Sequence, residues 1–387
     1  MIKRALAIRH LMDLLRVPGP SGGEAAVAAL VSAKLIKGGC KKSWLSHDSA
    51  HKKIGGGYEV GNLIVKLPGT TKGPRRLFSG HMDTVPLCRG AVPVRRGNRI
   101  VPRTRTALGG DNRTAVSCLV TIVETLLHEK LPHPPLTFLF TVGEEVGLRG
   151  ARQVKSSDLG KPAMGFNYDG GDPASIIIGA TGADRWQAEV RGISSHAGVH
   201  PEDGVSAALI TSKAISEIAA KGFFGDVRKG KKTGTSNVGP MQGGEATNQV
   251  TDLMVLRGEC RSHDAAFLDR ITEAYRRSFE AAAASVKNAA GKSGSVKFNI
   301  ARDYHSFEMK SDSPVVRRTQ DAVKELGLEP RLVIANGGLD ANWLNRKGIP
   351  TVTLGAGQHN AHTLREYADI REYLLGCELG LSLATTV

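Results

Sequence analysis

The chain has 387 residues, of which 23% are charged and 41% hydrophobic, and its formal net charge is +15. This length and composition exclude a disordered tail, a collagen-like fibre and a small disulfide-framed protein, and no apolar run approaches the ~18 residues that a membrane helix requires. The positive residues are spread along the chain and only 5% of residues are aromatic, so we expect a solvated basic surface rather than a nucleic-acid-binding one.

The first expected element is an amphipathic N-terminal helix, in which Ile8, Leu11, Met12 and Leu15 share one face. It lacks the long apolar stretch of a signal peptide, although its basic residues leave a transit peptide open. The five cysteines are scattered and form no Cys-x-x-Cys pair, which indicates free thiols in a reducing compartment. We therefore expect a cytoplasmic protein.

Helices and strands alternate after this first helix. Ser21 to Glu24 matches the Ser-x-x-Glu capping box, which predicts a helix over 25–37 that ends at Gly38-Gly39. The clearest helical pattern lies at 113–130. Such alternation indicates an α/β sheet flanked by helices. The apolar runs that predict strands are 63–67, 77–79, 136–141, 166–168 and 351–354.

The middle of the chain has a different pattern, which indicates a small α+β domain inserted into a larger one. Gly and Lys residues punctuate its stretch at 222–244, and the basic run at 228–232 within it is expected to be an exposed loop. We expect the inserted domain at 184–300 and a discontinuous larger domain formed by 1–183 and 301–387. The expected elements of the insert are strands at 186–191, 252–260 and 297–300 and helices at 205–221 and 267–287.

Clusters of histidine and carboxylate residues follow the predicted strands of the larger domain. In open α/β sheets, sites gather beyond the carboxyl ends of strands, so these distant clusters can converge. Nitrogen and oxygen donors without thiols suit Zn²⁺, Co²⁺ or Mn²⁺, and two neighbouring metals need a shared carboxylate. Each cluster alone is more simply a solvated or hydrogen-bonded group; together they favour a metal site. The clusters lie at 79–84, 109–112, 141–145, 167–171 and 355–362.

These motifs resemble the M20 family of dinuclear zinc peptidases. The resemblance rests on HMDT at 81–84, GDN at 110–112, GEEVG at 143–147 and the segment around His362, and it covers nearly the whole chain. GEEVGLRGA at 143–151 and NYD at 167–169 favour the tripeptide aminopeptidase, or peptidase T-like, branch. The resemblance implies a catalytic domain with a mixed sheet flanked by helices and a smaller inserted α+β domain that forms a dimer.

The resemblance also implies the metal ligands. His81 and Asp169 would bind one divalent ion, Glu145 and His362 would bind the other, and Asp111 would bridge both. Zn²⁺ is expected, with Co²⁺ or Mn²⁺ as alternatives. The family often has Asp-Asp at the bridge where this chain has Asp-Asn, but only the first of the two is a ligand by resemblance.

Other residues carry catalytic roles by the same resemblance. Asp83 would orient His81. Glu144 would be the general base that moves a proton from a metal-bridging water to the leaving amine. His196, in the motif GISSHAG at 192–198, would reach the partner subunit of a homodimer and stabilise the oxyanion there. Residues that resemble substrate contacts are Asn248, Arg261, Gly337 and Gly338.

The expected function is metal-dependent hydrolysis of short peptides, with release of the N-terminal residue from tripeptides. Another M20 amidohydrolase activity stays open: an N-acyl amino acid deacylase, a dipeptidase or a carboxypeptidase would use the same metals and base. A non-catalytic binding protein on the same fold is a further alternative. We expect no nucleic-acid or membrane partner, and whether the +15 charge selects acidic substrates stays open.

Overall fold

The computed structural model describes residues 1–385 and divides the chain into two compact units. Unit 1 comprises Met1–Ala180 and Phe307–Val387, and unit 2 comprises Thr181–Ser306. Unit 2 extends beyond the expected 184–300 at both ends, because its strands β9 (Gly182–Arg191) and β13 (Ser295–Tyr304) continue to the points where the chain enters and leaves it.

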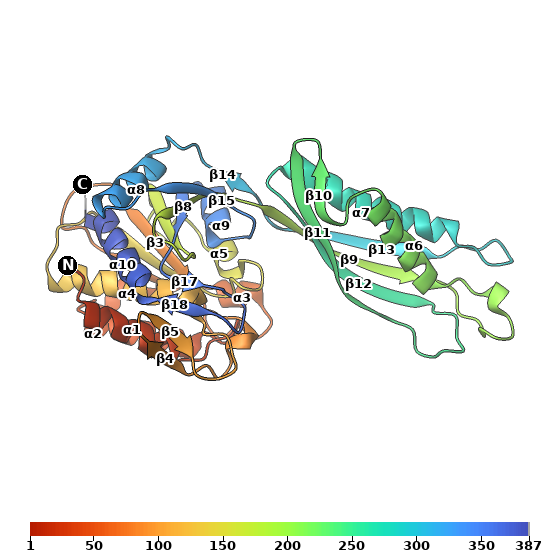
Figure 1. Ribbon diagram of the computed structural model, residues 1–387, viewed down its shortest axis with the longest axis horizontal. Helices are drawn as coiled ribbons and strands as arrows, with labels where there is room; N and C mark the ends of the chain where they lie inside the picture. The colour runs from red at the N-terminus through yellow and green to blue at the C-terminus, as the bar shows by residue number, and fades with distance from the viewer. Residues whose placement is uncertain (386–387) are drawn as a thin grey trace. The chain divides into compact units, whose positions relative to one another are not determined.

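Unit 1 is built on a nine-stranded mixed sheet with the order β1-β2-β6-β3-β7-β16-β8-β14, in which β15 also pairs with β8. The four strands β6, β3, β7 and β16 are parallel, so their carboxyl ends lie along one edge of the sheet. Figure 1 labels β3, β8 and β15 of this sheet within unit 1. This result confirms the expected α/β fold. The strands are β1 (Leu45–His47), β2 (Leu63–Leu67), β3 (Arg76–His81), β6 (Leu136–Thr141), β7 (Met164–Tyr168), β8 (Ser175–Ala180), β14 (Phe307–Glu308), β15 (Arg331–Ala335) and β16 (Thr351–Leu354).

Helices cover both faces of this sheet. Successive residues of a strand point to opposite faces, and here the residues on both faces are buried and apolar. Phe78 and Phe138 belong to the main core, whereas the neighbouring Leu77 and Leu139 belong to a second, smaller core. Helix α4 crosses the main-core face and packs against β3, α1, α2 and α10. The helices of unit 1 are α1 (Arg4–Leu15), α2 (Ala25–Lys37), α3 (Ala50–Ile54), α4 (Gly110–His128), α5 (Arg149–Gln153), α8 (Pro314–Glu325), α9 (Asp340–Arg346) and α10 (Ile370–Thr385).

A second, four-stranded sheet in unit 1 holds the segment that carries the last predicted ligand. Its order is β17-β18-β5-β4, and β17 also packs against α4. The residues between β17 and β18 therefore form a loop fixed at both ends, and His362 lies in that loop. The strands are β4 (Pro93–Arg96), β5 (Arg99–Pro102), β17 (Gln358–His359) and β18 (Tyr367–Asp369).

Unit 2 is a five-stranded antiparallel sheet with the order β10-β11-β12-β9-β13, and α6 and α7 pack against it. The sequence interpretation missed two strands here: the stretch 222–244 forms β10 and β11. The basic run at 228–232, expected as an exposed loop, covers the exposed turn at Gly230 and the strand ends on either side of it. Most side chains of β11 are exposed and polar, so the sequence has no clear alternation there. The remaining elements are α6 (Ala207–Ala220), α7 (Ala265–Ser285), β10 (Gly225–Lys229), β11 (Lys232–Gly243) and β12 (Leu253–Ser262).

The capping box predicted for Ser21 and Glu24 is also absent from the described N-terminus of α2. Glu24 is itself the N-cap residue and makes no side-chain cap hydrogen bond. The Ser21 hydroxyl donates to Asp83 Oδ2 at 2.6 Å, and Glu24 Oε1 accepts from the backbone N–H of Gly143 at 2.9 Å. Glu24 Oε1 keeps one local contact, with the N–H of Gly22 at 3.0 Å, while the contacts with Asp83 and Gly143 are tertiary. Across residues 1–385, no helix combines the length and apolar character needed to span a membrane.

Candidate metal centre

Ligand atoms from three distant segments meet at the carboxyl edge of the parallel strands. His81 is the last residue of β3, Asp111 lies in the first turn of α4, and Glu145 lies in the turn after β6. One ligand atom from each of these side chains lies within 4.8 Å of the others. The sheet edge therefore brings together residues that the sequence separates by up to 64 positions (145 − 81).

The two carboxylate oxygens of Asp111 face two different imidazoles. Asp111 Oδ1 is 3.1 Å from His81 Nε2, and Asp111 Oδ2 is 3.4 Å from His362 Nε2. His362 Nε2 is also 2.8 Å from Glu145 Oε2, and His81 Nε2 is 3.8 Å from Asp169 Oδ1. All five predicted ligands are thus brought together, with Asp111 in the middle. A carboxylate that bridges two metals needs this kind of placement.

The donor set fits divalent metals. Imidazole and carboxylate groups are the ligands of catalytic zinc sites. Glu145 Oε1 is buried and has no hydrogen-bond partner, which is costly for a carboxylate unless a cation or another group satisfies it. The site therefore has both the residues and an unsatisfied oxygen that a metal would use.

Burial and crowded negative charge dominate the electrostatics of the site. Burial raises the pKa of Glu145 to about 7, and burial together with the Asp111 carboxylate raises the pKa of Asp169. Burial also raises the pKa of Glu144 well above its usual value. Hydrogen bonds to Asp111 and Glu145 raise the pKa of His362 to about 10. The pKa of His81 is raised as well, by the carboxylates around it. The carboxylates of the site thus outnumber its two positively charged imidazoles, and divalent cations would supply the missing positive charge.

Asp83 connects the first histidine to the turn that carries the glutamates. His81 Nδ1 lies 3.1 Å from the backbone carbonyl oxygen of Asp83 and 3.4 Å from the side-chain Oδ1 of Asp83. The fully buried Asp83 carboxylate also accepts the backbone N–H groups of Glu144, at 3.0 Å, and Glu145, at 3.2 Å. Asp83 therefore contacts both the backbone of this turn and the predicted ligand His81.

Glu366 is a residue of the site that the sequence interpretation missed. Its buried carboxylate accepts three backbone N–H groups, from Leu108 at 2.7 Å and from Gly109 and Asp111 at 2.9 Å. Glu366 follows His362 by four positions, so one short segment carries a predicted ligand and a support for the Asp111 turn. Nothing in the sequence around Glu366 distinguishes a buried, hydrogen-bonded glutamate from an ordinary surface glutamate.

Three other supporting residues were missed. Gln358 Nε2 donates to Asp169 Oδ1 at 3.2 Å. Asp340 is buried, accepts a hydrogen bond from the Thr141 hydroxyl, and has a pKa that burial raises to about 7. The sequence interpretation singled out the preceding Gly337 and Gly338, which lie half-buried between β15 and α9. The third supporting residue is Glu24, described above.

Two predicted site segments of unit 2 lie side by side. The Ala197 N–H donates to the Asn248 carbonyl oxygen at 2.9 Å, and His196 pairs with Gln249 in an isolated bridge. Gln249 Nε2 also donates to the Ser194 hydroxyl at 2.9 Å. The motif at 192–198 and the segment around Asn248 therefore form one exposed loop region.

Arg261 lies elsewhere in unit 2. It is near the end of β12 and pairs with Ala183, whereas Leu253, at the start of β12, pairs with Arg191. Eight residues of strand separate these two ends, or about 26 Å at about 3.3 Å per residue. Because the His196 loop follows Arg191, the structure does not bring Arg261 and His196 together within unit 2. The Arg261 side chain pairs with Glu259 at 3.0 Å.

Comparison with known proteins identifies the family to which this chain belongs. A model of peptidase family M20/M25/M40 matches residues 77–386. The protein YqjE of Bacillus subtilis, which is uncharacterised, is 29% identical over 384 residues, covering 99% of this chain and 98% of that one. A Peptidase T of Clostridium botulinum is 25% identical over 295 residues, covering 74% of this chain and 67% of the relative.

Two solved structures are similar along their whole length. The aminopeptidase PepT from Bacillus cereus has a TM-score of 0.84 and 29% identity, covering 99% of this chain and 98% of that one. A tripeptidase from Staphylococcus aureus has a TM-score of 0.88 and 28% identity, covering 100% and 98%. The family model covers well over half of the chain, and the fold agrees throughout. The chain is a hydrolytic peptidase that belongs to peptidase family M20/M25/M40.

Proposed function

We propose that this peptidase is a metal-dependent aminopeptidase that releases the N-terminal residue of short peptides, tripeptides above all. The observation that carries the proposal is the Asp111 carboxylate, whose two oxygens each face a different imidazole. The whole-length similarity to a PepT and to a tripeptidase supports this specificity over a deacylase or carboxypeptidase.

In this proposal His81 and Asp169 hold one divalent ion, Glu145 and His362 hold the other, and Asp111 is shared. Zn²⁺ suits this donor set best, and Co²⁺ or Mn²⁺ can replace it. When bound, such ions polarise the scissile carbonyl and lower the pKa of water. Asp83 and Glu366 keep the ligand-bearing turns in place through their backbone hydrogen bonds.

Glu144 is the proposed general base. Its carboxylate is buried, and its Oε2 lies 3.8 Å from His81 Nε2, at the edge of the proposed metal site. In the reaction it takes a proton from the attacking water and delivers it to the leaving amine. Its neighbour Glu145 binds metal in this proposal, so one of the two adjacent glutamates is a ligand and the other is the base.

The proposed assembly is a homodimer formed through unit 2, in which His196 donates a hydrogen bond to the developing oxyanion in the partner subunit. The support comes from the position of the exposed His196 loop within unit 2. The chain enters this unit beside Gly182, at the start of β9, whereas the His196 loop follows the other end of that strand. His196 is therefore remote, along β9, from the point where its own chain enters the unit. Asn248, Arg261, Gly337 and Gly338 are proposed substrate contacts.

A cytoplasmic location is part of the same proposal. All five cysteines are free and four of them are buried, as is usual for proteins of reducing compartments.

The test of the function is hydrolysis of a matched peptide panel by the metal-reconstituted protein, with mass spectrometry to identify the bond that is cut. We expect a tripeptide with a free N-terminus to lose its first residue. The same tripeptide with an acetylated N-terminus is the control and should stay intact. Release of the C-terminal residue, or faster cleavage of N-acyl amino acids or dipeptides, would show one of the other amidohydrolase activities.

A further inference from the structure

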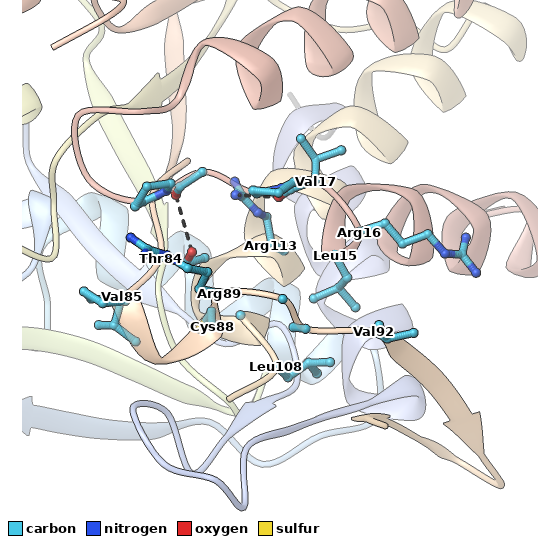
Figure 2. A pocket seen from close by; sticks show the side chains of 17 residues that line it. Leu15, Arg16, Val17, Thr84, Val85, Cys88, Arg89, Val92, Leu108 and Arg113 are labelled. Atoms are coloured by element: carbon cyan, nitrogen blue, oxygen red, sulfur yellow. Dashed lines mark hydrogen bonds between the residues drawn. The ribbon is translucent and has the colours of Figure 1, made fainter. Parts of the chain in front are cut away.

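A cavity of about 220 Å³ lies in unit 1 beside the N-terminal part of α4 (Figure 2). It is partly open to solvent and is lined by the end of α1, the segment 17–20, the residues after β3 and the turn before α4. This volume exceeds the ~150 Å³ of an engineered cavity that holds benzene. Most of the wall is apolar, with Val17, Pro20, Val85, Ala91 and Leu108 among the lining residues. The cavity can therefore accept a small apolar group.

The charged groups of the cavity all have one sign. None of the described residues that line it is acidic, whereas Arg16, Arg89 and Arg113 are among them. Figure 2 shows Arg16 turned away from Arg113, and its side chain is 57% exposed. Arg113 and Arg89 are therefore the two cations available to a ligand.

Arg113 is a buried cation with incomplete hydrogen bonding. Its guanidinium donates to the carbonyl oxygens of Met82 and Val17, the latter at 3.3 Å, although an arginine carries five N–H groups. Asp83 and Glu24 act on it through space, but neither accepts a hydrogen bond from it among the described contacts. A buried charge is normally paired with an opposite charge in direct contact. Arg113 has no such partner among the described contacts, so an anion bound in the cavity would be the first to pair with it directly.

The other polar groups of the wall itself carry no negative charge. Burial and the Glu366 carboxylate behind the wall, 4.0 Å from Cys88 Sγ, raise the pKa of the Cys88 thiol to about 12, so it is neutral at physiological pH. The Thr84 hydroxyl donates to the Gly19 carbonyl oxygen at 3.4 Å. Arg89 is exposed and forms no ion pair with the described residues.

We propose that this cavity binds a small carboxylate with a branched apolar tail of about four to six carbons. The carboxylate would lie at Arg113 and Arg89, and the tail would pack against Val17, Val85 and Leu108. The site is separate from the metal centre, because none of the proposed metal ligands lines the cavity. It goes beyond the proposed peptidase reaction and does not depend on it.

The first experiment is calorimetric titration of the metal-free full-length protein with 4-methylpentanoate. Removing the metals prevents the carboxylate from binding to them in the catalytic site. We expect saturable binding of one molecule per chain, and roughly tenfold weaker binding of the neutral 4-methylpentanamide, which has the same tail but cannot pair with a guanidinium. Absence of saturable binding, or equal binding of acid and amide, would overturn the proposal.

Substitutions then locate the ligand. Arg89→Gln should weaken 4-methylpentanoate binding roughly three- to tenfold, whereas Arg96→Gln, an exposed arginine of β4 outside the cavity, should leave it unchanged. Ala91 lines the cavity and is half-buried, so the larger side chain of Ala91→Trp should fill the cavity and abolish binding. Circular dichroism would show that this variant is folded. Wild-type binding by both folded variants at 89 and 91 would place the ligand elsewhere and refute the assignment.

Discussion

The Glu366 carboxylate accepts the backbone N–H of Asp111 at 2.9 Å, although 255 positions separate the two residues. This bond links the loop that carries His362 to the turn that carries the central carboxylate of the proposed metal centre. The two turns therefore hold each other in place before any metal binds.

This link predicts that Glu366→Gln lowers metal affinity about 10- to 100-fold, the usual effect of losing a group that orients ligands. The amide retains one accepting oxygen but turns N–H donors toward backbone N–H groups. Competition with a chromogenic chelator measures the affinity. Glu378→Gln, on α10 and away from this turn, is the control and should bind metal like the wild type. Equal affinities for both variants would contradict a supporting role for Glu366.

The shared position of Asp111 predicts the metal content of its variants. Wild-type protein loaded with Zn²⁺ and desalted should carry about two ions per chain, and Asp111→Ala should carry one or none, because both proposed sites lose a ligand. Elemental analysis by mass spectrometry gives the count. Asp321→Ala, at an exposed position of α8, is the matched control. Two tightly held ions in the Asp111 variant would refute the bridging assignment.

Glu144→Gln should leave the metals bound and lower the rate of peptide hydrolysis on the order of 10²–10⁴-fold, because the amide cannot carry the proton. Metal content and kcat are measured on the same preparation. Near-normal turnover with two ions present would remove Glu144 from the role of base.

The proposed role of His196 predicts complementation between inactive subunits. Mixed dimers of His196→Ala and Glu144→Gln should recover part of the activity, since one of their two sites combines an intact Glu144 with a donated His196. Mass spectrometry of differently tagged subunits shows whether exchange has occurred. Mixed dimers without activity would mean that His196 does not act across subunits.

Glu24 predicts a pH dependence of stability. Burial raises its pKa in the folded protein from 4.5 to about 7. Between these values the folded state holds more protons than the unfolded state, so the contribution of Glu24 to stability falls as the pH rises from 4.5 to 7. Glu24→Gln does not titrate, and its free energy of unfolding relative to wild type should rise by roughly 1–3 kcal/mol over this range.

Urea unfolding at several pH values measures this difference. Glu329→Gln, at an exposed carboxyl, is the control and should follow the wild-type profile. A difference between Glu24→Gln and wild type that is the same at every pH would contradict the predicted titration.

The convergence of the motifs that carry the proposed ligands could be predicted because metal chemistry limits the choice of residue. His81, Asp111 and Glu145 stand at the ends of apolar strands or the start of a helix, and the topology brings these points to one edge of the sheet. Glu366 and Gln358 could not be predicted in the same way. Glu366 accepts three backbone N–H groups and Gln358 donates to a carboxylate oxygen, and these partners become available only once the fold is complete.

Local patterns were misleading where tertiary contacts or exposure outweighed them. Ser21 and Glu24 match a capping motif, yet their side chains bond to Asp83 and Gly143, far away in sequence. In unit 2, β11 lies at 232–243 with most of its side chains in water, so neither alternation nor apolar composition marks it as a strand.

The order of the proposed ligands along the chain has a consequence for the newly made protein. The strand β16 takes its place between β7 and β8, and His362 and Glu366 follow it. A nascent chain on the ribosome therefore lacks one proposed ligand and the support of Asp111 until translation has passed residue 366. We expect the protein to remain without peptidase activity throughout most of its own synthesis, so that incomplete products cannot cut peptides.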